Sequence, residues 1–256
     1  MLFVPFVALA VAATLFIIGR VMASKASLIK GARMTTVAEL AAEAASIGGG
    51  ASGFVGLSGK AVCDQPLKAE LSETPCVHYQ VKVVREYEEA YTTTGSDGSN
   101  QTQTRRGMDN VALNTRSCPF AIDDGTGSVA VDAAGAEYKL ATTVERYEPG
   151  ETLGTIGAFV LSEMIAGAGR RTIGYRLEEK CLPLGRMVYA FGEAGFENGK
   201  PILRKGGERG SRLIVSVESG EQLARSAGNV SLWLTIVSGV ALAAAALLEI
   251  LILIKR

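Results

Sequence analysis

The sequence predicts a mainly β soluble domain, an OB-like small barrel with one or two helices, flanked by two transmembrane α-helices. Two apolar runs, from Leu2 to Ile18 and from Val230 to Ile254, indicate the membrane helices. Each run is long enough to cross a hydrocarbon core of about 30 Å. Between the runs the composition is polar, and short alternating segments separated by glycine-rich turns predict strands.

The first apolar run also has features of a secretory signal peptide, because it is short and precedes the small-residue stretch from Met22 to Ala26. However, no basic residue precedes it, and its apolar core is longer than that of most signal peptides. We therefore expect an uncleaved anchor, with both termini on the same side of the bilayer. The expected order is a transmembrane helix (1–19), a juxtamembrane helix (20–47), the β domain (50–224) and a second transmembrane helix (229–254).

Basic residues flank the two apolar runs unequally. Four follow the first run and two follow the second (Arg20, Lys25, Lys30 and Arg33, against Lys255 and Arg256). Because positively charged flanks stay in the cytoplasm, this count favours a cytoplasmic β domain.

Small residues four apart in each apolar run favour close packing of the helices, either with each other or in a homo-oligomer; the alternative is that small size simply reflects composition, since alanines also fill 244–246. These pairs are Ala8 with Ala12 and Gly239 with Ala243. Glu249 is the one charge inside the second run. Its carboxylate reaches the headgroups, is neutralised by protonation, or contacts another membrane helix.

The overall charge argues against a nucleic-acid partner. Twenty-six basic residues balance twenty-six acidic ones, so the chain has no net field that attracts phosphate. The tyrosines available for base stacking, such as Tyr87 and Tyr147, also lie among glutamates. The expected partners are the lipid bilayer and a protein or peptide, and we expect no cofactor.

Strand signals run through the middle of the chain. From Cys76 to Glu86 apolar and polar residues alternate well, and the Asp123-Asp124-Gly125-Thr126-Gly127 segment has the residues that tight turns require. A helix is expected from Leu153 to Ala166, and an exposed hairpin tip from Thr92 to Arg106. Further strands are expected at 54–62, 111–115, 120–122, 128–131, 186–192, 200–204 and 213–217.

The order of several segments resembles the GIDE, or "beside a membrane" (BAM), domain family. These are Gly59-Lys60, the stretch from Leu71 to Tyr79, then Phe120 to Val131 and Gly185 to Gly192, all between the two apolar runs. The family is known from membrane-anchored E3 ubiquitin ligases of mitochondria and chloroplasts and from shorter prokaryotic relatives. The resemblance implies a domain that binds or senses something near a membrane.

The ligases of this family carry a zinc-binding RING domain with eight Cys and His ligands after the second membrane helix. This sequence has four cysteines and one histidine, none in a CxxC spacing. We therefore expect a short, prokaryotic-type relative without the RING, and a tethered binding or sensing domain that is non-catalytic by itself. The alternatives are an E3 ubiquitin ligase-related protein and a membrane-bound hydrolase.

Few residues are candidates for chemistry. Cys76 and His78 are two apart in an expected strand, so they share a face, yet about 6 to 7 Å is too far for a direct hydrogen bond. Asp123 and Asp124 are weak metal candidates, because a turn explains them equally well. Cys63 and Cys76 could form a disulfide in an oxidising compartment, although buried free thiols are the default.

Overall fold

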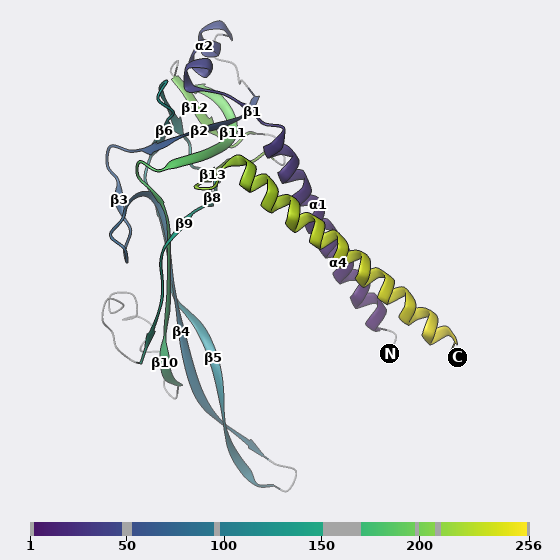
Figure 1. The fold of residues 1–256 in the computed structure, drawn as a ribbon. Helices are drawn as coiled ribbons and strands as arrows, with labels where there is room; N and C mark the ends of the chain where they lie inside the picture. The colour runs from purple at the N-terminus through teal and green to yellow at the C-terminus, as the bar shows by residue number, and fades with distance from the viewer. Residues whose placement is uncertain are drawn as a thin grey trace. The chain divides into compact units, whose positions relative to one another are not determined.

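The computed structural model describes residues 3–47, 53–94, 98–150, 170–197, 200–207 and 211–254. The expected fold class is confirmed, because the chain is mainly β, with a closed five-strand barrel and three helices in the described residues (Figure 1). The helix expected from Leu153 to Ala166 lies outside the described residues. By contact the chain divides into two compact units, one comprising 1–58, 134–137 and 189–256, the other 59–133 and 138–188.

Eight strands form the first sheet, in the order β1-β2-β6-β7-β12-β11-β13-β8. An additional pairing of β2 with β11 closes five of them into the barrel. Most of these strands match the segments expected from the sequence. They are short apolar runs between glycine and aspartate turns, a pattern that is typical of small barrels. The strands are β1 (Arg33–Met34), β2 (Gly53–Val62), β6 (Phe120–Asp123), β7 (Ser128–Val131), β8 (Glu137–Lys139), β11 (Met187–Glu197), β12 (Lys200–Arg204) and β13 (Ile214–Ser216).

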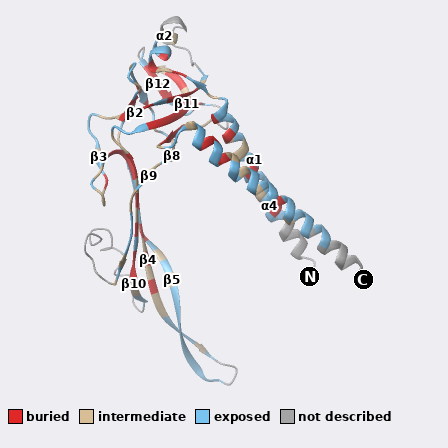
Figure 2. Cartoon of the chain, viewed as in Figure 1, coloured by how far each residue is buried: buried red, intermediate tan, exposed pale blue. Residues whose placement is uncertain are grey.

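In the first unit, helices α1 (Phe3–Lys30) and α4 (Gly220–Ile254) lie side by side, with the N and C termini at the same end of the pair (Figure 1). Ile29, near the C-terminal end of α1, and Leu223, near the N-terminal end of α4, pack in an apolar cluster with Tyr189 and Phe191. Elsewhere both helices are largely exposed (Figure 2). Apolar side chains on the outside of a helix pair are what a lipid environment accommodates.

The expected juxtamembrane helix over 20–47 is two helices instead of one. The first long helix, α1, continues to Lys30, and a separate helix, α2 (Val37–Ile47), follows the short strand β1. A capping box starts α2: Glu39 N–H donates to Thr36 Oγ1 at 3.3 Å, and Thr36 N–H donates to Glu39 Oε2 at 3.1 Å. The Thr-x-x-Glu spacing in the sequence is the signal that marks this break.

A second capping box extends α4 toward the domain. Ser219 N–H donates to Gln222 Oε1 at 3.0 Å, and Gln222 N–H donates to Ser219 Oγ at 3.2 Å. The helix therefore begins at Gly220, before the apolar run that predicted a start at 229.

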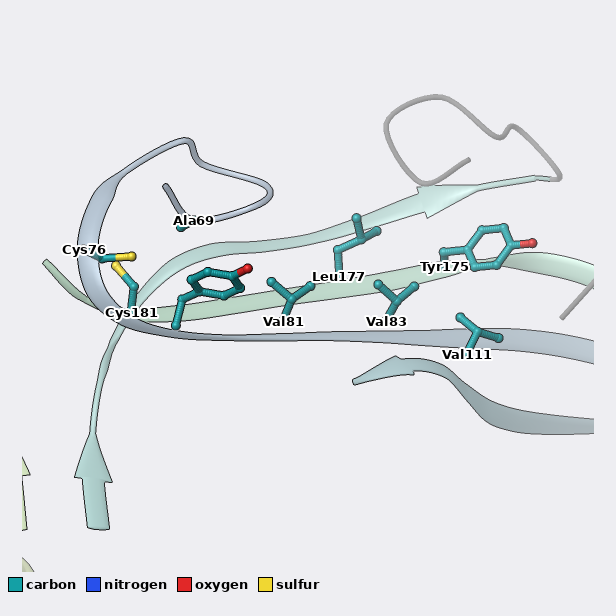
Figure 3. Packing of buried hydrophobic residues seen from close by; sticks show 9 residues of the cluster. Ala69, Cys76, Val81, Val83, Val111, Tyr175, Leu177 and Cys181 are labelled. Atoms are coloured by element: carbon teal, nitrogen blue, oxygen red, sulfur yellow. The ribbon is translucent and has the colours of Figure 1, made fainter. Parts of the chain in front are cut away.

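In the second unit, a five-stranded sheet contains a long hairpin of β4 and β5, with β10 on the other side of β4 and β9 beside β10 (Figure 1). One face buries an apolar cluster that includes Cys76, Val81, Val83, Leu177 and Cys181 (Figure 3). The expected exposed tip lies at the end of this hairpin, but most of it is paired strand, with Thr92 opposite Thr102. The strands are β3 (Leu67–Lys68), β4 (Pro75–Thr94), β5 (Asn100–Ser117), β9 (Ala141–Pro149) and β10 (Arg170–Pro183).

Ion pairs join the strands of the long hairpin. Arg105 pairs with Glu89 and Arg106 with Glu88, each directly opposite the other across β4 and β5. These basic residues lie on a strand, and opposite charges facing each other across a strand pair stabilise its register. They are therefore part of a paired strand and not of the unpaired tip that the expected span from Thr92 to Arg106 implies.

Candidate functional site

The outward face of the β2 and β6 pair forms the candidate binding site. Ala61 and Ile122 lie opposite one another on these antiparallel strands, and both are fully buried in the core. Because side chains alternate along a strand, the neighbours Lys60 and Val62 turn to the other face.

Two adjoining cavities lie along this face. The first, of about 430 Å³, is lined by residues 62–64, residues 119–121 and Ser128. The second, of about 320 Å³, is lined by residues 59–60, Val62, residues 123–125 and Met187. Val62 lines both cavities, so we treat them as one feature, the β2–β6 strip. Both volumes lie within the range typical of ligand sites, about 300–1,000 Å³.

The charges on the β2–β6 strip are predominantly acidic. Asp64 lines the first cavity, and Asp123 and Asp124 line the second together with Lys60. Three carboxylates against one ammonium group give a negative potential, which favours a positively charged ligand group.

Gly59 lets β2 and β6 approach closely beside the strip. A Cβ atom at Gly59 would lie 2.6 Å from the carbonyl oxygen of Asp123 and 2.7 Å from Ile122 Cγ2. Only glycine fits without a backbone shift, so this part of the Gly59-Lys60 pattern has a packing role.

The two candidate metal ligands act as turn acceptors. Asp123 Oδ1 accepts from the amide of Gly125 at 2.8 Å, and Asp124 Oδ1 accepts from the amide of Thr126 at 2.8 Å. The Thr126 hydroxyl also donates to Asp124 Oδ1, at 2.7 Å. Such side-chain contacts define tight Asx turns. Among the residues the structure describes, no three His, Cys, Asp or Glu side chains come together as metal ligands do.

Two thiols lie at the edge of the first cavity. Cys63 Sγ is 3.4 Å from Cys118 Sγ and donates to the carbonyl oxygen of Pro119 at 3.1 Å. Burial, followed by the hydrogen bond with Cys63, raises the pKa of Cys118 to about 11. All four cysteines are free thiols. Cys63 therefore lies beside Cys118 and not beside Cys76, the partner considered from the sequence.

Cys76 and His78 do not share a face, which corrects the expectation from strand alternation. Across from them on β10, Leu182 pairs with His78 and the next residue, Pro183, pairs with Cys76. One extra residue on β4 is therefore a β-bulge, which reverses the alternation. Cys76 packs in the apolar cluster, where Figure 3 shows its sulfur beside that of Cys181.

His78 occupies a buried site on the other side of β4. Its ring stacks on Tyr138 with centroids 3.8 Å apart, and its Nδ1 lies 2.6 Å from Ser117 Oγ. The imidazole is 3% exposed, and burial lowers its pKa to about 4. Among the residues that the structure describes, His78 Nε2 has no hydrogen-bond partner, so no third group there orients the ring as a catalytic base requires. The contacts indicate a neutral packing residue.

Glu179 is a buried, hydrogen-bonded carboxylate that the sequence analysis missed. It is fully buried on β10, and its carboxylate accepts hydrogen bonds from the amides of Leu71 and Ser72 and from the hydroxyl of Thr143. Burial alone would raise its pKa, but these hydrogen bonds outweigh burial and lower it. The carboxylate thereby fixes the loop that precedes Cys76.

Comparison with known families identifies the chain. A model of the GIDE family, described as an E3 ubiquitin ligase, matches residues 88–248, well over half of the chain. The chain belongs to the GIDE family. The match confirms the resemblance, but it does not bear out the narrower expectation of a short prokaryotic relative without a RING domain. No curated protein and no solved structure matches the chain.

The matched GIDE segment includes most of α4, which packs against α1 at Gly19. A Cβ atom at Gly19 would lie 3.3 Å from Leu234 Cβ and 3.5 Å from Thr235 Oγ1. The sequence analysis missed Gly19, although a glycine at the edge of an apolar run is a packing signal.

The small residues predicted to pack differ in their exposure. Ala12 is fully buried, whereas Gly239 and Ala243 are exposed, and no atom in the described part of the chain lies within 4 Å of a Cβ placed at Gly239. The side chains of Ala8 and Glu249 lie outside the described residues. Packing at Gly239 and Ala243 remains a prediction that concerns a second copy.

Proposed function

We propose that this GIDE-family chain is a membrane-tethered recognition domain that binds a polypeptide segment carrying a basic side chain. The observation that carries the proposal is the β2–β6 strip, with its two adjoining cavities and its three aspartates. An extended peptide presents side chains at regular spacing, so it suits a pair of neighbouring cavities better than one compact ligand does.

The domain acts by binding and not by catalysis. An active site needs several titratable groups in one concave place, with a base oriented toward a nucleophile. The single histidine of the chain is buried beside Tyr138, and Cys76 is buried in a separate apolar cluster. This arrangement disfavours the alternative of a membrane-bound hydrolase.

Tethering rests on the helix pair. Within the described residues, Ala10–Lys30 and Gly220–Ala244 are long and apolar enough to cross a membrane, by length and composition. Large apolar side chains on both helices face outward in this chain, which suits lipid. Examples are Phe16, Ile17, Leu232, Trp233, Val240 and Leu247. The excess of basic residues after the first apolar run supports a cytoplasmic β domain with both termini on the opposite side.

A peptide selection tests the binding proposal. The full chain in lipid nanodiscs is used to select from a random peptide library. We expect enrichment of peptides with Lys or Arg, and at least about tenfold weaker binding of those peptides to Asp64→Lys, because the variant inverts the charge of the first cavity. Glu178→Lys, which changes a charge outside the strip, is the matched control. Equal binding to the parent and to Asp64→Lys would contradict the proposal.

The family description favours a second candidate, a direct role in ubiquitin transfer. A RING domain needs eight zinc ligands, and these 256 residues contain four cysteines and one histidine. We therefore expect the chain to supply recognition and membrane attachment to a ligase system and not the transfer step. An ubiquitination assay with purified E1 and a panel of E2 enzymes tests this: we expect no ubiquitin chains, and chain formation by these residues alone would favour the second candidate.

A further inference from the structure

We propose that Cys63 and Cys118 form a reversible disulfide, a thiol-modification site at the edge of the first cavity. The oxidant is a low-molecular-weight disulfide of the glutathione class.

The geometry already brings the two sulfur atoms together. They lie 3.4 Å apart, and a disulfide bond of about 2.05 Å requires the gap to close by only about 1.4 Å. Strand pairing holds the two backbones in place, because Val62, the residue before Cys63, pairs with Ala121, which lies on β6 shortly after Cys118. The amide of Cys118 also donates to the carbonyl oxygen of Val77 at 2.9 Å. Rotation of side chains, without rearrangement of the strands, can therefore close the bond.

The other two cysteines provide a contrast within the same unit. Cys76 and Cys181 are both fully buried, whereas Cys63 and Cys118 are partly exposed. Burial raises the pKa of Cys76 to about 12, and it also raises the pKa of Cys181. An oxidant in solution does not reach a fully buried thiol, so burial is what sets these two cysteines apart from Cys63 and Cys118.

The exchange runs in two balanced steps. The Cys63 thiolate attacks one sulfur of oxidised glutathione, which forms a mixed disulfide and releases one glutathione thiolate. The Cys118 thiol then gives its proton to solvent and attacks Cys63 Sγ, which releases the second glutathione. Two protein thiols are oxidised by two electrons, and one glutathione disulfide is reduced to two thiols.

The structure assigns the two roles. Cys63 lines the first cavity, so an oxidant in solution can reach it. Cys118 resolves the mixed disulfide, because its raised pKa makes it the poorer first nucleophile while its position beside Cys63 makes the second step intramolecular.

The test is disulfide mapping of the full chain in lipid nanodiscs across a series of ratios of oxidised to reduced glutathione. Acid quenching, alkylation and peptide mass spectrometry are expected to show Cys63 linked to Cys118, and dithiothreitol should reverse the link. The variant Cys118→Ser should instead retain glutathione on Cys63. The double variant Cys76→Ser with Cys181→Ser is the matched control and should still form the link.

Two results would overturn the proposal: alkylated Cys63 and Cys118 at every ratio, or a link from either one to Cys76 or Cys181. Because mapping requires no bound peptide, its outcome is independent of the peptide selection that tests the proposed function.

Discussion

The carboxylate of Glu179 accepts a hydrogen bond from the backbone amide of Leu71 at 2.6 Å. The two residues are far apart in the sequence, and the contact secures the loop between β3 and β4 to the middle of β10. A buried carboxylate that accepts several N–H and O–H donors is stable only while all of them remain in place.

We predict that Glu179→Ala lowers the free energy of unfolding by about 2–4 kcal/mol, because it leaves buried donors without an acceptor. Urea unfolding in detergent micelles, followed by circular dichroism of the β domain, measures this change. Glu178→Ala is the matched control on the next residue; its partner is Lys180 in a half-exposed ion pair, so we expect a change of about 0.5 kcal/mol or less. Equal effects of both substitutions would show that the Glu179 contacts are not stabilising.

His78 predicts a pH dependence of stability. Its pKa falls from 6.5 to about 4 on folding, so between these values the unfolded chain binds more protons. The contribution of His78 to the free energy of unfolding is therefore fully present above pH 6.5. It is lost as pH falls toward 4, by up to about 3 kcal/mol. Glu179 titrates in a lower window, because its folded pKa lies below its usual 4.5.

The measurement is the urea midpoint at about pH 7 and about pH 5 for the parent and for His78→Phe. The aromatic substitution retains a stacking partner for Tyr138 and removes the only histidine of the chain. We expect the parent to lose stability over this interval and the variant to lose much less. The same loss of stability over this pH interval in the parent and in the variant would exclude His78 as the source of the pH dependence.

The close contact at Gly19 predicts that a larger side chain there destabilises the pair of helices α1 and α4. Gly19→Leu inserts a side chain where a Cβ atom already meets Leu234 Cβ at 3.3 Å, so we expect a loss of about 1–3 kcal/mol. Gly228→Leu on α4 is the matched control, because no atom of the described residues lies within 4 Å of its Cβ position. Thermal unfolding in nanodiscs compares the two variants, and an equal loss for Gly228→Leu would argue against the observed helix contact at Gly19.

The exposed pair of Gly239 and Ala243 predicts self-association. Small residues four apart permit close approach of a second helix, so Gly239→Leu should reduce dimer formation several-fold. Energy transfer between labelled copies in liposomes measures this. Gly228→Leu, which also enters open space, should leave association unchanged. Similar energy transfer in the parent and in Gly239→Leu would show that two copies do not associate through this face of α4.

Local patterns in the sequence account for most of the fold. The alternation after Cys76 predicts β4, and the aspartate-glycine turn predicts the β6 and β7 hairpin, because both signals are confined to neighbouring residues. The continuation of β4 to Thr94 and the strand β10 are harder to predict. Charged and threonine-rich stretches become strands there because ion pairs and backbone pairing compensate for weak apolar patterning.

The site depends more on long-range contacts. The turn role of Asp123 and Asp124 follows from adjacent residues and is visible in the sequence. The closeness of Cys63 and Cys118 arises from the pairing of β2 with β6, and the separation of Cys76 from His78 arises from a single bulge. Neither feature has a local signature, because both depend on the register of strands far apart in the chain.

The central claim is that a recognition domain is held at a bilayer by α1 and α4, and alkaline extraction of membranes followed by high-speed sedimentation tests it most directly. We predict that the full chain stays in the membrane pellet at high pH and enters solution only with detergent. Recovery of the full chain in the aqueous supernatant without detergent would contradict the account.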